Sequence, residues 1–375
     1  MKVLLFARDG ALPGLTGAQG IREWELAQQL HADGLDLWVI SKMFPGRLLP
    51  FTRRYGMPIV RMPYYPRILR SMLWPQELAF WAKVLSPDIV HFVIPDMVFL
   101  DSVSGFTPVL DKLRCPVLSE LNFVPHKWAK STLDVVQVSG DTLCVSTGIQ
   151  EEVKRHLPQA NTFVLPNGID MERFSTPDQN IVNKAKALLK GRGTEGKRIV
   201  LHIGSVDEHR CILQLIEAMK LVCSRQRDVC LLIVGIGEHL QAAEKRVHDL
   251  AIQEEVLFLG KVDHSVIPGI MSFAKVGVAL SDKETAPFTS PMKLFEYMAA
   301  GLPLVTVNAG DMPSYVDSQF ACFADPESPP AIASAIEQAL QMEQEASIKA
   351  RRVAQKFSWK EITASIEDRY KMLLV

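Results

Sequence analysis

The sequence predicts an α/β protein made of two Rossmann-like units, each a parallel sheet covered by helices. Short apolar runs rich in β-branched residues alternate with longer helical patterns along the chain, which is typical of parallel sheets. This series starts again near residue 199. The chain has 375 residues, 48% of them hydrophobic and 22% charged, which is enough for two soluble domains.

In the first unit the apolar runs predict strands, in chain order, at residues 3–7, 35–41, 59–62, 88–94, 116–121, 142–146 and 162–165. In the second unit they predict strands at residues 199–203, 229–234, 256–259, 276–280, 302–307 and 321–323. The segment 170–197 is polar and poorly patterned, and its glycine-rich, charged KGRGTEGK portion predicts a surface loop or linker. We expect the hinge near residues 166–170. A last helical segment covers residues 359–374.

Composition excludes several classes of function. The formal net charge of -1 argues against a nucleic-acid partner, since such proteins usually carry a basic excess. The six cysteines are scattered with no CxxC pair, which indicates buried, reduced thiols in a cytoplasmic protein. The apolar run at residues 3–7 is too short for a signal peptide, and no window approaches the ~20 apolar residues of a membrane span.

Each unit opens with a strand, a loop and an amphipathic helix. In the second unit Gly204 ends the strand and Arg210 lies in the loop before the helix, a combination that suits an anion such as a diphosphate. An ordinary connection with Arg210 in solvent fits the spacing equally well. In the first unit Gly14, Gly17 and Gly20 would let a ligand approach the backbone. Two such units facing each other would form a deep cleft beyond the carboxyl ends of their strands.

The stretch SPMKLFEYMAAGLPLV predicts a helix with Ser290 as N-cap, Pro291 in the first turn and Gly301 at its end. Lys293 in the first turn opposes the helix dipole, which suggests a bound anion. Glu296 lies in an otherwise apolar helix, and burying it requires donors such as the vicinal diol of a ribose. A local ion pair between Lys293 and Glu296 is the alternative.

These stretches together resemble the family-4 retaining glycosyltransferases of the GT-B fold over nearly the full chain. The motifs, in family order, are TGAQGIREWELAQQL, PDIVH, PVLSELNFVP, VLPNGIDMERF, IGSVDEHRCILQLIEAM, LLIVGIGE, VLFLGKV and SPMKLFEYMAAGLPLV. The resemblance implies an N-terminal acceptor domain (1–168 with 357–375, the last helix crossing back) and a C-terminal donor domain (169–356). It implies transfer of a sugar, with retention, from a UDP-, GDP- or other nucleotide sugar, without a metal or other cofactor.

Carried over by position, the resemblance implies the following site. Arg210, Lys293 and Asn122 would be catalytic. Gly17 would lie near the sugar, Val262 by the base and Glu296 on the ribose. The diphosphate would meet the backbone from Ser290 to Leu294, which includes Pro291 and Met292, and Gly204 and Ser205 would also belong to the donor site.

Four positions depart from the usual family pattern. They are Ser205 for Arg, Phe288 for Glu, Asn122 for His and Ser314 for Glu, a combination that resembles a subgroup. Two rival hypotheses are a silent sugar-nucleotide-binding protein, which Ser205 and Phe288 allow, and a sugar-nucleotide epimerase on the same architecture.

One segment of the first unit bears on the acceptor. Between Lys42 and Lys83 eight cations face one acidic residue and alternate with aromatic side chains: Lys42, Arg47, Arg53, Arg54, Arg61, Arg67, Arg70, Lys83, Phe44, Phe51, Tyr64, Tyr65, Trp74, Phe80 and Trp81. Such a mixture favours an anionic membrane surface or a polyanionic acceptor. We expect a peripheral enzyme on the inner face of the membrane that acts on a lipid-linked or cell-surface glycan. A solvated face with its aromatic side chains packed inward is the alternative.

Overall fold

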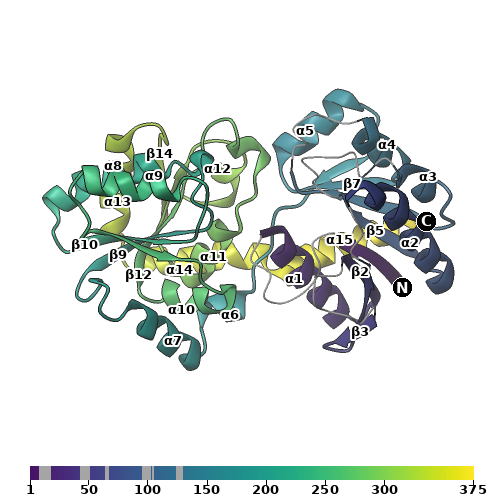
Figure 1. The fold of residues 1–375 in the computed structure, drawn as a ribbon, viewed down its shortest axis with the longest axis horizontal. Coiled ribbons are helices and arrows are strands. Elements are labelled where there is room, and N and C mark those ends of the chain that lie inside the picture. Colours follow the sequence, from purple (N-terminus) through teal and green to yellow (C-terminus); the bar gives the residue numbers. More distant parts are fainter. Residues whose placement is uncertain (8–17, 43–50, 64–66, 95–102, 104, 124–129) are drawn as a thin grey trace. The chain divides into compact units, whose positions relative to one another are not determined.

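A computed structural model describes residues 1–7, 18–42, 51–63, 67–94, 103, 105–123 and 130–375. The chain forms two compact units, one of residues 1–167 with 359–375 and the other of residues 168–358 (Figure 1). Each unit is a largely parallel sheet flanked by helices, so the predicted α/β fold class is confirmed.

The first unit contains an eight-stranded sheet of order β3-β4-β2-β1-β5-β6-β7-β8. Its strands are β1 (Lys2–Ala7), β2 (Asp36–Lys42), β3 (Phe51–Arg54), β4 (Met57–Met62), β5 (Ile89–Val93), β6 (Val117–Leu121), β7 (Asp141–Cys144) and β8 (Thr162–Val164). Its helices are α1 (Ala18–Ala32), α2 (Arg67–Leu85), α3 (Thr107–Leu110), α4 (Lys130–Val138), α5 (Thr147–His156) and α15 (Trp359–Leu373). Neighbouring strands are parallel except for β3, which forms an antiparallel edge with β4.

The second unit contains a six-stranded parallel sheet of order β11-β10-β9-β12-β13-β14. Its strands are β9 (Arg198–Ile203), β10 (Val229–Val234), β11 (Val256–Gly260), β12 (Ala274–Ala279), β13 (Leu304–Val307) and β14 (Ala321–Ala324). Its α-helices are α6 (Met171–Ser175), α7 (Gln179–Leu189), α8 (Ile212–Arg225), α9 (Leu240–Asp249), α10 (Ile267–Met271), α11 (Met292–Ala300), α12 (Met312–Tyr315), α13 (Pro329–Leu340) and α14 (Gln344–Ala354). Four short 3-10 helices complete it: η1 (Glu208–Arg210), η2 (His264–Val266), η3 (Ala286–Phe288) and η4 (Gln355–Phe357).

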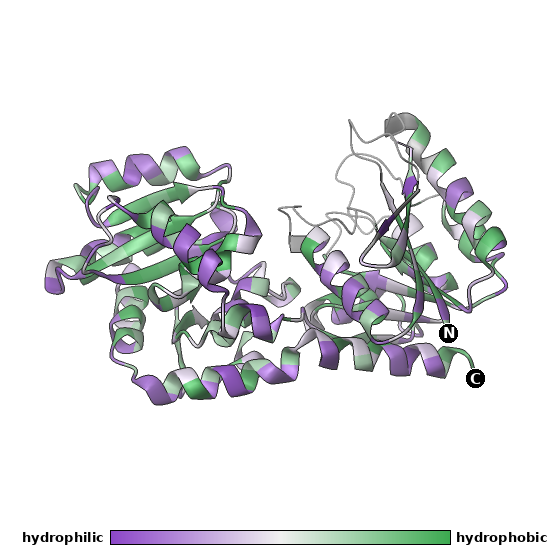
Figure 2. Ribbon diagram, turned by 90° about the horizontal axis from the view of Figure 1, so that it is seen from below, coloured by the Kyte–Doolittle hydropathy of each residue, from purple (hydrophilic) through white to green (hydrophobic). Residues whose placement is uncertain are grey.

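The core of each unit lies between its sheet and its helices. Apolar strands are covered by helices with hydrophilic outer faces, as the green sheet and purple helix surfaces of the second unit show in Figure 2. Helix α11 is buried from Leu294 to Ala299 and ends at Gly301, whose φ of 76° lets the chain turn sharply into β13. The apolar α11 and the strand after it are therefore central to the second unit.

All the predicted strands are present, but two other predictions for the backbone were wrong. The segment before residue 190, predicted to lack regular structure, folds into α6 and α7, because Phe174, Ala185 and Leu189 pack against the core. Residues 190–197 form a surface loop, as predicted. Ser290 is not an N-cap, since α11 begins at Met292 after an extended Pro291.

The last helix, α15, belongs to the first unit, where it runs alongside α1 (Figure 1). All six cysteines are free and all but Cys115 are buried, as the scattered spacing predicted. Among the helices formed by the described residues, none has the length and apolarity needed to span a bilayer.

Candidate functional site

The carboxyl end of β9 and the start of α11 meet in the second unit. Gly204 follows β9 with a φ of 120°, and a Cβ atom at this position would lie 2.9 Å from Nζ of Lys293. The Lys293 ammonium group thus rests against the glycine backbone. Glycine is required here for both its dihedral angle and its lack of a side chain.

The Lys293 ammonium group is buried and forms no direct ion pair with the described residues. Among the residues that the structure describes, its Nζ has no hydrogen-bond partner. Burial first, and the nearby charge of Arg210 second, hold the pKa of Lys293 well below its usual range. A buried cation of this kind is unfavourable unless an anion joins it.

Arg210 is the second cation of this site. It ends η1 directly before α8, and among the described residues its buried Nε also lacks a hydrogen-bond partner. Burial lowers its pKa, while the charges of Asp207 and Asp282 act in the opposite direction. The sequence left an ordinary solvated Arg210 open, and the burial of its Nε argues against that alternative.

His202 sits beneath these two cations on β9. Its ring is fully buried, and its Nε2 lies 3.4 Å from the carbonyl oxygen of Ser205, to which it can only donate. Burial and then the charge of Lys293 hold the pKa of His202 well below its usual range. The ring is therefore neutral and adds no third charge to the site.

The start of α11 adds backbone dipoles to the two cations. The N–H of Leu294 already donates to the Pro291 carbonyl at 3.0 Å, so the N–H groups of Met292 and Lys293 are those without an acceptor within the helix. Ser290 is buried just before this turn. Two buried cations and a helix N-terminus can together hold an anion of two charges.

Glu296 lies one turn further along α11 and is 4% exposed. Its Oε1 accepts a hydrogen bond from Nε2 of His264 at 2.7 Å. No ion pair joins Lys293 and Glu296, both of which are described, so this alternative interpretation was wrong. No sequence pattern indicated His264, because it lies 32 positions from Glu296 on a different element.

Val262 lies two residues before His264, in the connection from β11, and packs against the core of the second unit. The structure therefore brings Gly204, Arg210, Lys293 and Glu296 to one edge of one sheet, with Val262 near His264. Gly17 lies outside the described residues.

Asn122 belongs to the first unit, just beyond β6, and its Nδ2 donates to Oε1 of Glu120 at 2.8 Å. Glu120 is the centre of a buried polar cluster that also includes Arg22 on α1, His91 on β5 and Tyr370 on α15. Arg22 Nε lies 3.0 Å from the same oxygen, and His91 Nε2 lies 3.2 Å from the other one. This cluster, which sequence patterns did not predict, holds Asn122 at the end of its strand.

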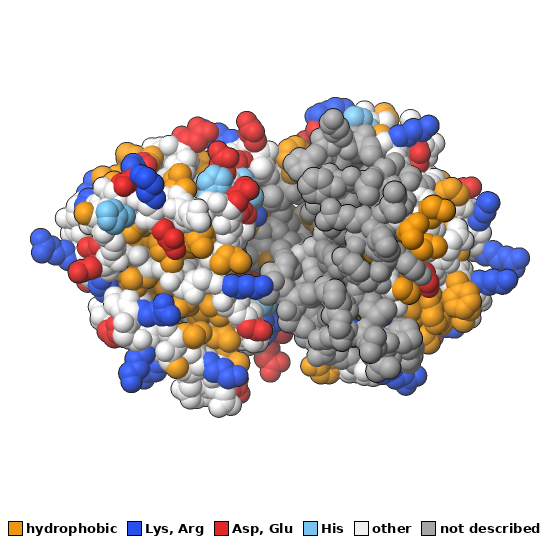
Figure 3. Space-filling view, in the orientation of Figure 1, with side chains coloured by type: hydrophobic (Ala, Val, Ile, Leu, Met, Phe, Trp, Pro, Cys, Tyr) orange, Lys and Arg blue, Asp and Glu red, His pale blue; other side chains and the backbone are white. Residues whose placement is uncertain are grey.

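The segment 42–83 agrees only in part with the predicted basic surface. Arg61 and Trp74 are buried, which corrects their assignment to that surface. Arg53 and Lys83 are exposed, whereas the side chains of Lys42, Arg47, Arg54, Arg67 and Arg70 lie outside the described set. Helix α2 exposes four apolar side chains at helical spacing: Leu69, Met72, Phe80 and Val84. Figure 3 shows hydrophobic side chains gathered over this helix at the right of the view.

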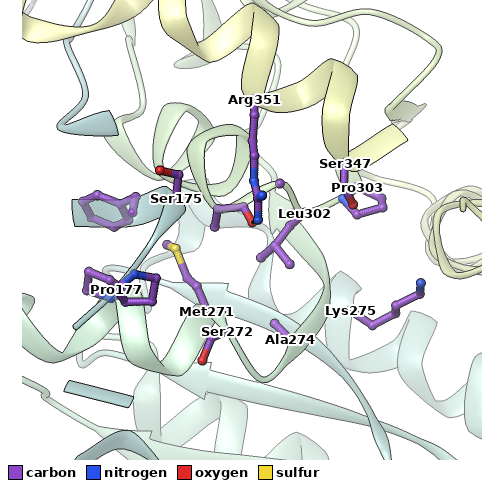
Figure 4. A pocket seen from close by; sticks show the side chains of 14 residues that line it. Ser175, Pro177, Met271, Ser272, Ala274, Lys275, Leu302, Pro303, Ser347 and Arg351 are labelled. Carbon is purple, nitrogen blue, oxygen red and sulfur yellow. The ribbon is translucent and has the colours of Figure 1, made fainter. Parts of the chain in front are cut away.

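A separate pocket of about 320 Å³ lies at the opposite edge of the second sheet. It is lined by the start of β12, the end of α11 and residues of α6 and α14. Arg351 reaches into it between Ser175 and Leu302 (Figure 4) and donates to the Ala300 carbonyl at 3.0 Å. Because α11 runs from one sheet edge to the other, this pocket is distinct from the site at Lys293.

Two family models match the chain. "Glycosyltransferase Family 4" matches residues 22–173, and "Glycosyl transferases group 1" matches residues 186–357. One curated relative is the N-acetyl-alpha-D-glucosaminyl L-malate synthase of Bacillus anthracis, 25% identical over 82% of this chain and 80% of the relative. A GDP-mannose-dependent phosphatidylinositol dimannoside mannosyltransferase of Mycobacterium tuberculosis is 24% identical, and the match covers 60% of this chain and 56% of that relative.

Solved structures share the fold over the full chain. A sucrose-phosphate synthase from Thermosynechococcus elongatus has a TM-score of 0.78 at 18% identity, and covers 99% of this chain and 98% of its own. The Anabaena protein HepE, solved with UDP and glucose, has a TM-score of 0.76 at 17% identity, and covers 99% and 100%. The two family models divide the chain as its two sheets do, and the chain is a glycosyltransferase of the GT-B type.

Proposed function

We propose that the chain transfers a sugar from a nucleoside diphosphate sugar to an acceptor hydroxyl, with retention of the anomeric configuration. The observation that carries this proposal is the pair of buried cations, Lys293 and Arg210, whose Nζ and Nε have no hydrogen-bond partner among the described residues. Beside Gly204 and the start of α11, they form a preorganised positive site. A diphosphate supplies the two negative charges that such a site lacks.

The chemistry follows from the charge that develops on the donor. As the bond from C1 of the sugar to the diphosphate breaks, negative charge grows on the departing oxygen, and fixed cations stabilise it most at that moment. The acceptor hydroxyl attacks C1 from the face that the diphosphate leaves, and its proton passes to the departing phosphate oxygen. Glu296 holds the ribose and Val262 lies by the base, while the assignment of Gly17 and Asn122 to the transferred sugar stays a prediction. No metal is required in this scheme.

Two findings support a nucleotide-sugar donor. HepE, which shares the fold, was solved with UDP-glucose, and one of the curated relatives is named as GDP-mannose-dependent. The test is to incubate the protein with UDP-glucose, UDP-N-acetylglucosamine and GDP-mannose, and to measure free nucleoside diphosphate and epimerised donor. We expect slow release of one nucleoside diphosphate even without acceptor. Epimerised donor would identify an epimerase, and tight binding without turnover a silent binding protein.

For the acceptor side we propose that α2 docks the first unit on an anionic membrane, where the acceptor is a lipid-linked glycan. Met72, Phe80 and Val84 are 65%, 57% and 55% exposed on α2, while Trp74 and Leu78 face the core. Exposed apolar side chains beside a cation such as Lys83 suit the boundary between lipid headgroups and acyl chains. The helix thus presents an apolar face that the first unit does not cover.

Sedimentation with phosphatidylglycerol vesicles tests this docking. We expect binding at low salt that weakens at high salt, and loss of most of it in Met72→Ser/Phe80→Ser. Ile348→Ser is the matched control, because Ile348 is 55% exposed on α14 of the other unit. No sedimentation at low salt, or equal loss in the control, would refute the docking while leaving the donor site unaffected.

A further inference from the structure

A chain of three hydrogen-bonded side chains ends at Glu296. Nη2 of Arg173, on α6, lies 2.8 Å from Nδ1 of His264, and Nε2 of His264 lies 2.7 Å from Oε1 of Glu296. The same Nη2 donates to the carbonyl oxygen of His264 at 2.9 Å. Arg173 therefore forms hydrogen bonds with both the ring and the backbone of His264. All three residues belong to the second unit.

This geometry determines which ring nitrogen carries the proton. A guanidinium group can only donate hydrogen bonds, so Nδ1 of His264 must accept. The hydrogen of the ring is then on Nε2, which donates to Glu296. Had Arg173 been absent, either tautomer could form, and one of them would present a lone pair to the carboxylate.

The arrangement is anchored beyond the three side chains. The carboxylate of Asp170 caps α6 by accepting a hydrogen bond from the N–H of Arg173 at 3.0 Å. This cap fixes the start of α6 and thereby the backbone position of Arg173. The ring of Phe174 lies against His264, with centroids 5.9 Å apart. Backbone, cap and aromatic ring thus hold His264 in one orientation.

We propose that His264 is a positioning residue that turns the Glu296 carboxylate so that Oε2 is offered to a ligand hydroxyl. The inference rests on the proposed function, in which that hydroxyl belongs to the ribose of the donor. The hydrogen bond from His264 occupies Oε1, so Oε2 is the carboxylate oxygen that can accept a hydrogen bond from the ligand. If the carboxylate could rotate freely, ligand binding would have to supply the entropic cost of ordering it. The hydrogen bond to the ligand hydroxyl would then contribute less to affinity.

The test measures hydroxyl discrimination rather than affinity alone. The probes are UDP and GDP with their 2′-deoxy and 3′-deoxy forms, bound to the intact protein and measured by calorimetry. For the nucleotide that binds, we expect the wild type to prefer the ribonucleotide over one deoxy form by roughly 10-fold or more, as for a hydrogen bond to a charged group. His264→Leu should reduce this ratio to within about 3-fold, with the affinity for the deoxy form nearly unchanged.

Two amide variants separate positioning from folding. In His264→Gln the side-chain amide can still reach Glu296, so we expect most of the ratio to return. In His264→Asn the shorter amide can still contact Arg173 but cannot reach Glu296. The ratio of ribonucleotide to deoxynucleotide affinity should therefore stay low, while thermal stability matches that of the Gln variant. If His264→Leu does not fold, the comparison of Gln with Asn carries the test alone.

Three outcomes would overturn the inference. An unchanged ratio in the Leu and Asn variants would show that Glu296 needs no positioning. Equal losses for the ribo and deoxy forms would assign His264 a purely structural role. A wild type that binds the nucleotide without discrimination would remove Glu296 from the ribose, whereas a wild type that binds no nucleotide would instead refute the proposed function.

Discussion

Lys293→Met changes stability and ligand binding in opposite directions. The Met side chain fills about the same space but carries no charge, and Nζ of Lys293 has no hydrogen-bond partner among the described residues. An unsatisfied buried polar group costs about 1–3 kcal/mol, and more when it is charged. We therefore expect the variant to be more stable than the wild type by at least about 1 kcal/mol, measured by urea unfolding.

Binding should weaken in the same variant. A hydrogen bond to a charged group contributes about 1.5–3 kcal/mol. Since 1.4 kcal/mol corresponds to a factor of ten, losing one such bond predicts a rise in Kd for the nucleoside diphosphate of about 10- to 150-fold. Calorimetry with UDP and GDP measures this change.

The pH dependence of the wild type follows from the lowered pKa of Lys293, which burial and then Arg210 cause. Between the lowered pKa of the folded chain and the ordinary value of 10.5, the unfolded chain binds more protons than the folded chain, so stability rises with pH across this window. A bound diphosphate favours the charged form of Lys293, so within that window binding takes up protons and weakens as the pH rises. Calorimetry in buffers of different ionisation enthalpy detects the uptake, which Lys293→Met should abolish.

The matched control is Lys275→Met, the same change at the opposite edge of the same sheet. It should alter neither nucleotide affinity nor proton uptake. If Lys293→Met lowers stability and leaves UDP and GDP binding at the wild-type level, Lys293 has a structural role only, and the reasoning about the buried cation is wrong.

Three more predictions concern single side chains. Arg210→Ala should reduce turnover by about 10²-fold or more, and wild-type kinetics would contradict its catalytic assignment. Gly204→Ala should weaken nucleoside diphosphate binding at least as much as it lowers stability, because its Cβ would displace Nζ of Lys293; stability loss alone would contradict this. Burial raises the pKa of Glu120, but Arg22 and His91 outweigh it and leave the pKa far below its ordinary 4.5. Because the pKa of Glu120 is depressed in the folded chain, its stabilisation is present above pH 4.5 and is lost as the pH falls further. Glu120→Gln should therefore lower the free energy of unfolding by about 3–5 kcal/mol at pH 7, measured in urea. Between pH 4.5 and 3 the variant should lose less stability than the wild type.

Sequence patterns predicted the sheets well because buried parallel strands are continuous apolar runs. Strand β3 was missed, since the polar FTRR stretch forms an antiparallel edge that needs no apolar run. Helix α7 was taken for a linker because only one narrow side of it is buried. These errors share a cause, since elements at the margin of a unit carry the weakest hydrophobic pattern.

For the site, the residues predicted from the sequence were those next to a strand end or a helix start. Gly204, Arg210 and Lys293 are of this kind, since the position of a residue in its element determines where it points. His264 and the Glu120 cluster could not be predicted in this way. Their partners come from three or four separate elements, and no spacing along the chain records such contacts.

The contact between His91 and Tyr370 has a consequence for synthesis on the ribosome. Nδ1 of His91 lies 2.6 Å from the hydroxyl oxygen of Tyr370, in the interior of the first unit. Residues 359–373 are translated only after the whole of the second unit. Until α15 is made, the core of the first unit around Glu120 and His91 is incomplete on one side. The second unit can therefore complete its fold before the first. In a purified chain truncated after residue 358, the second unit should accordingly resist proteolysis better than the first.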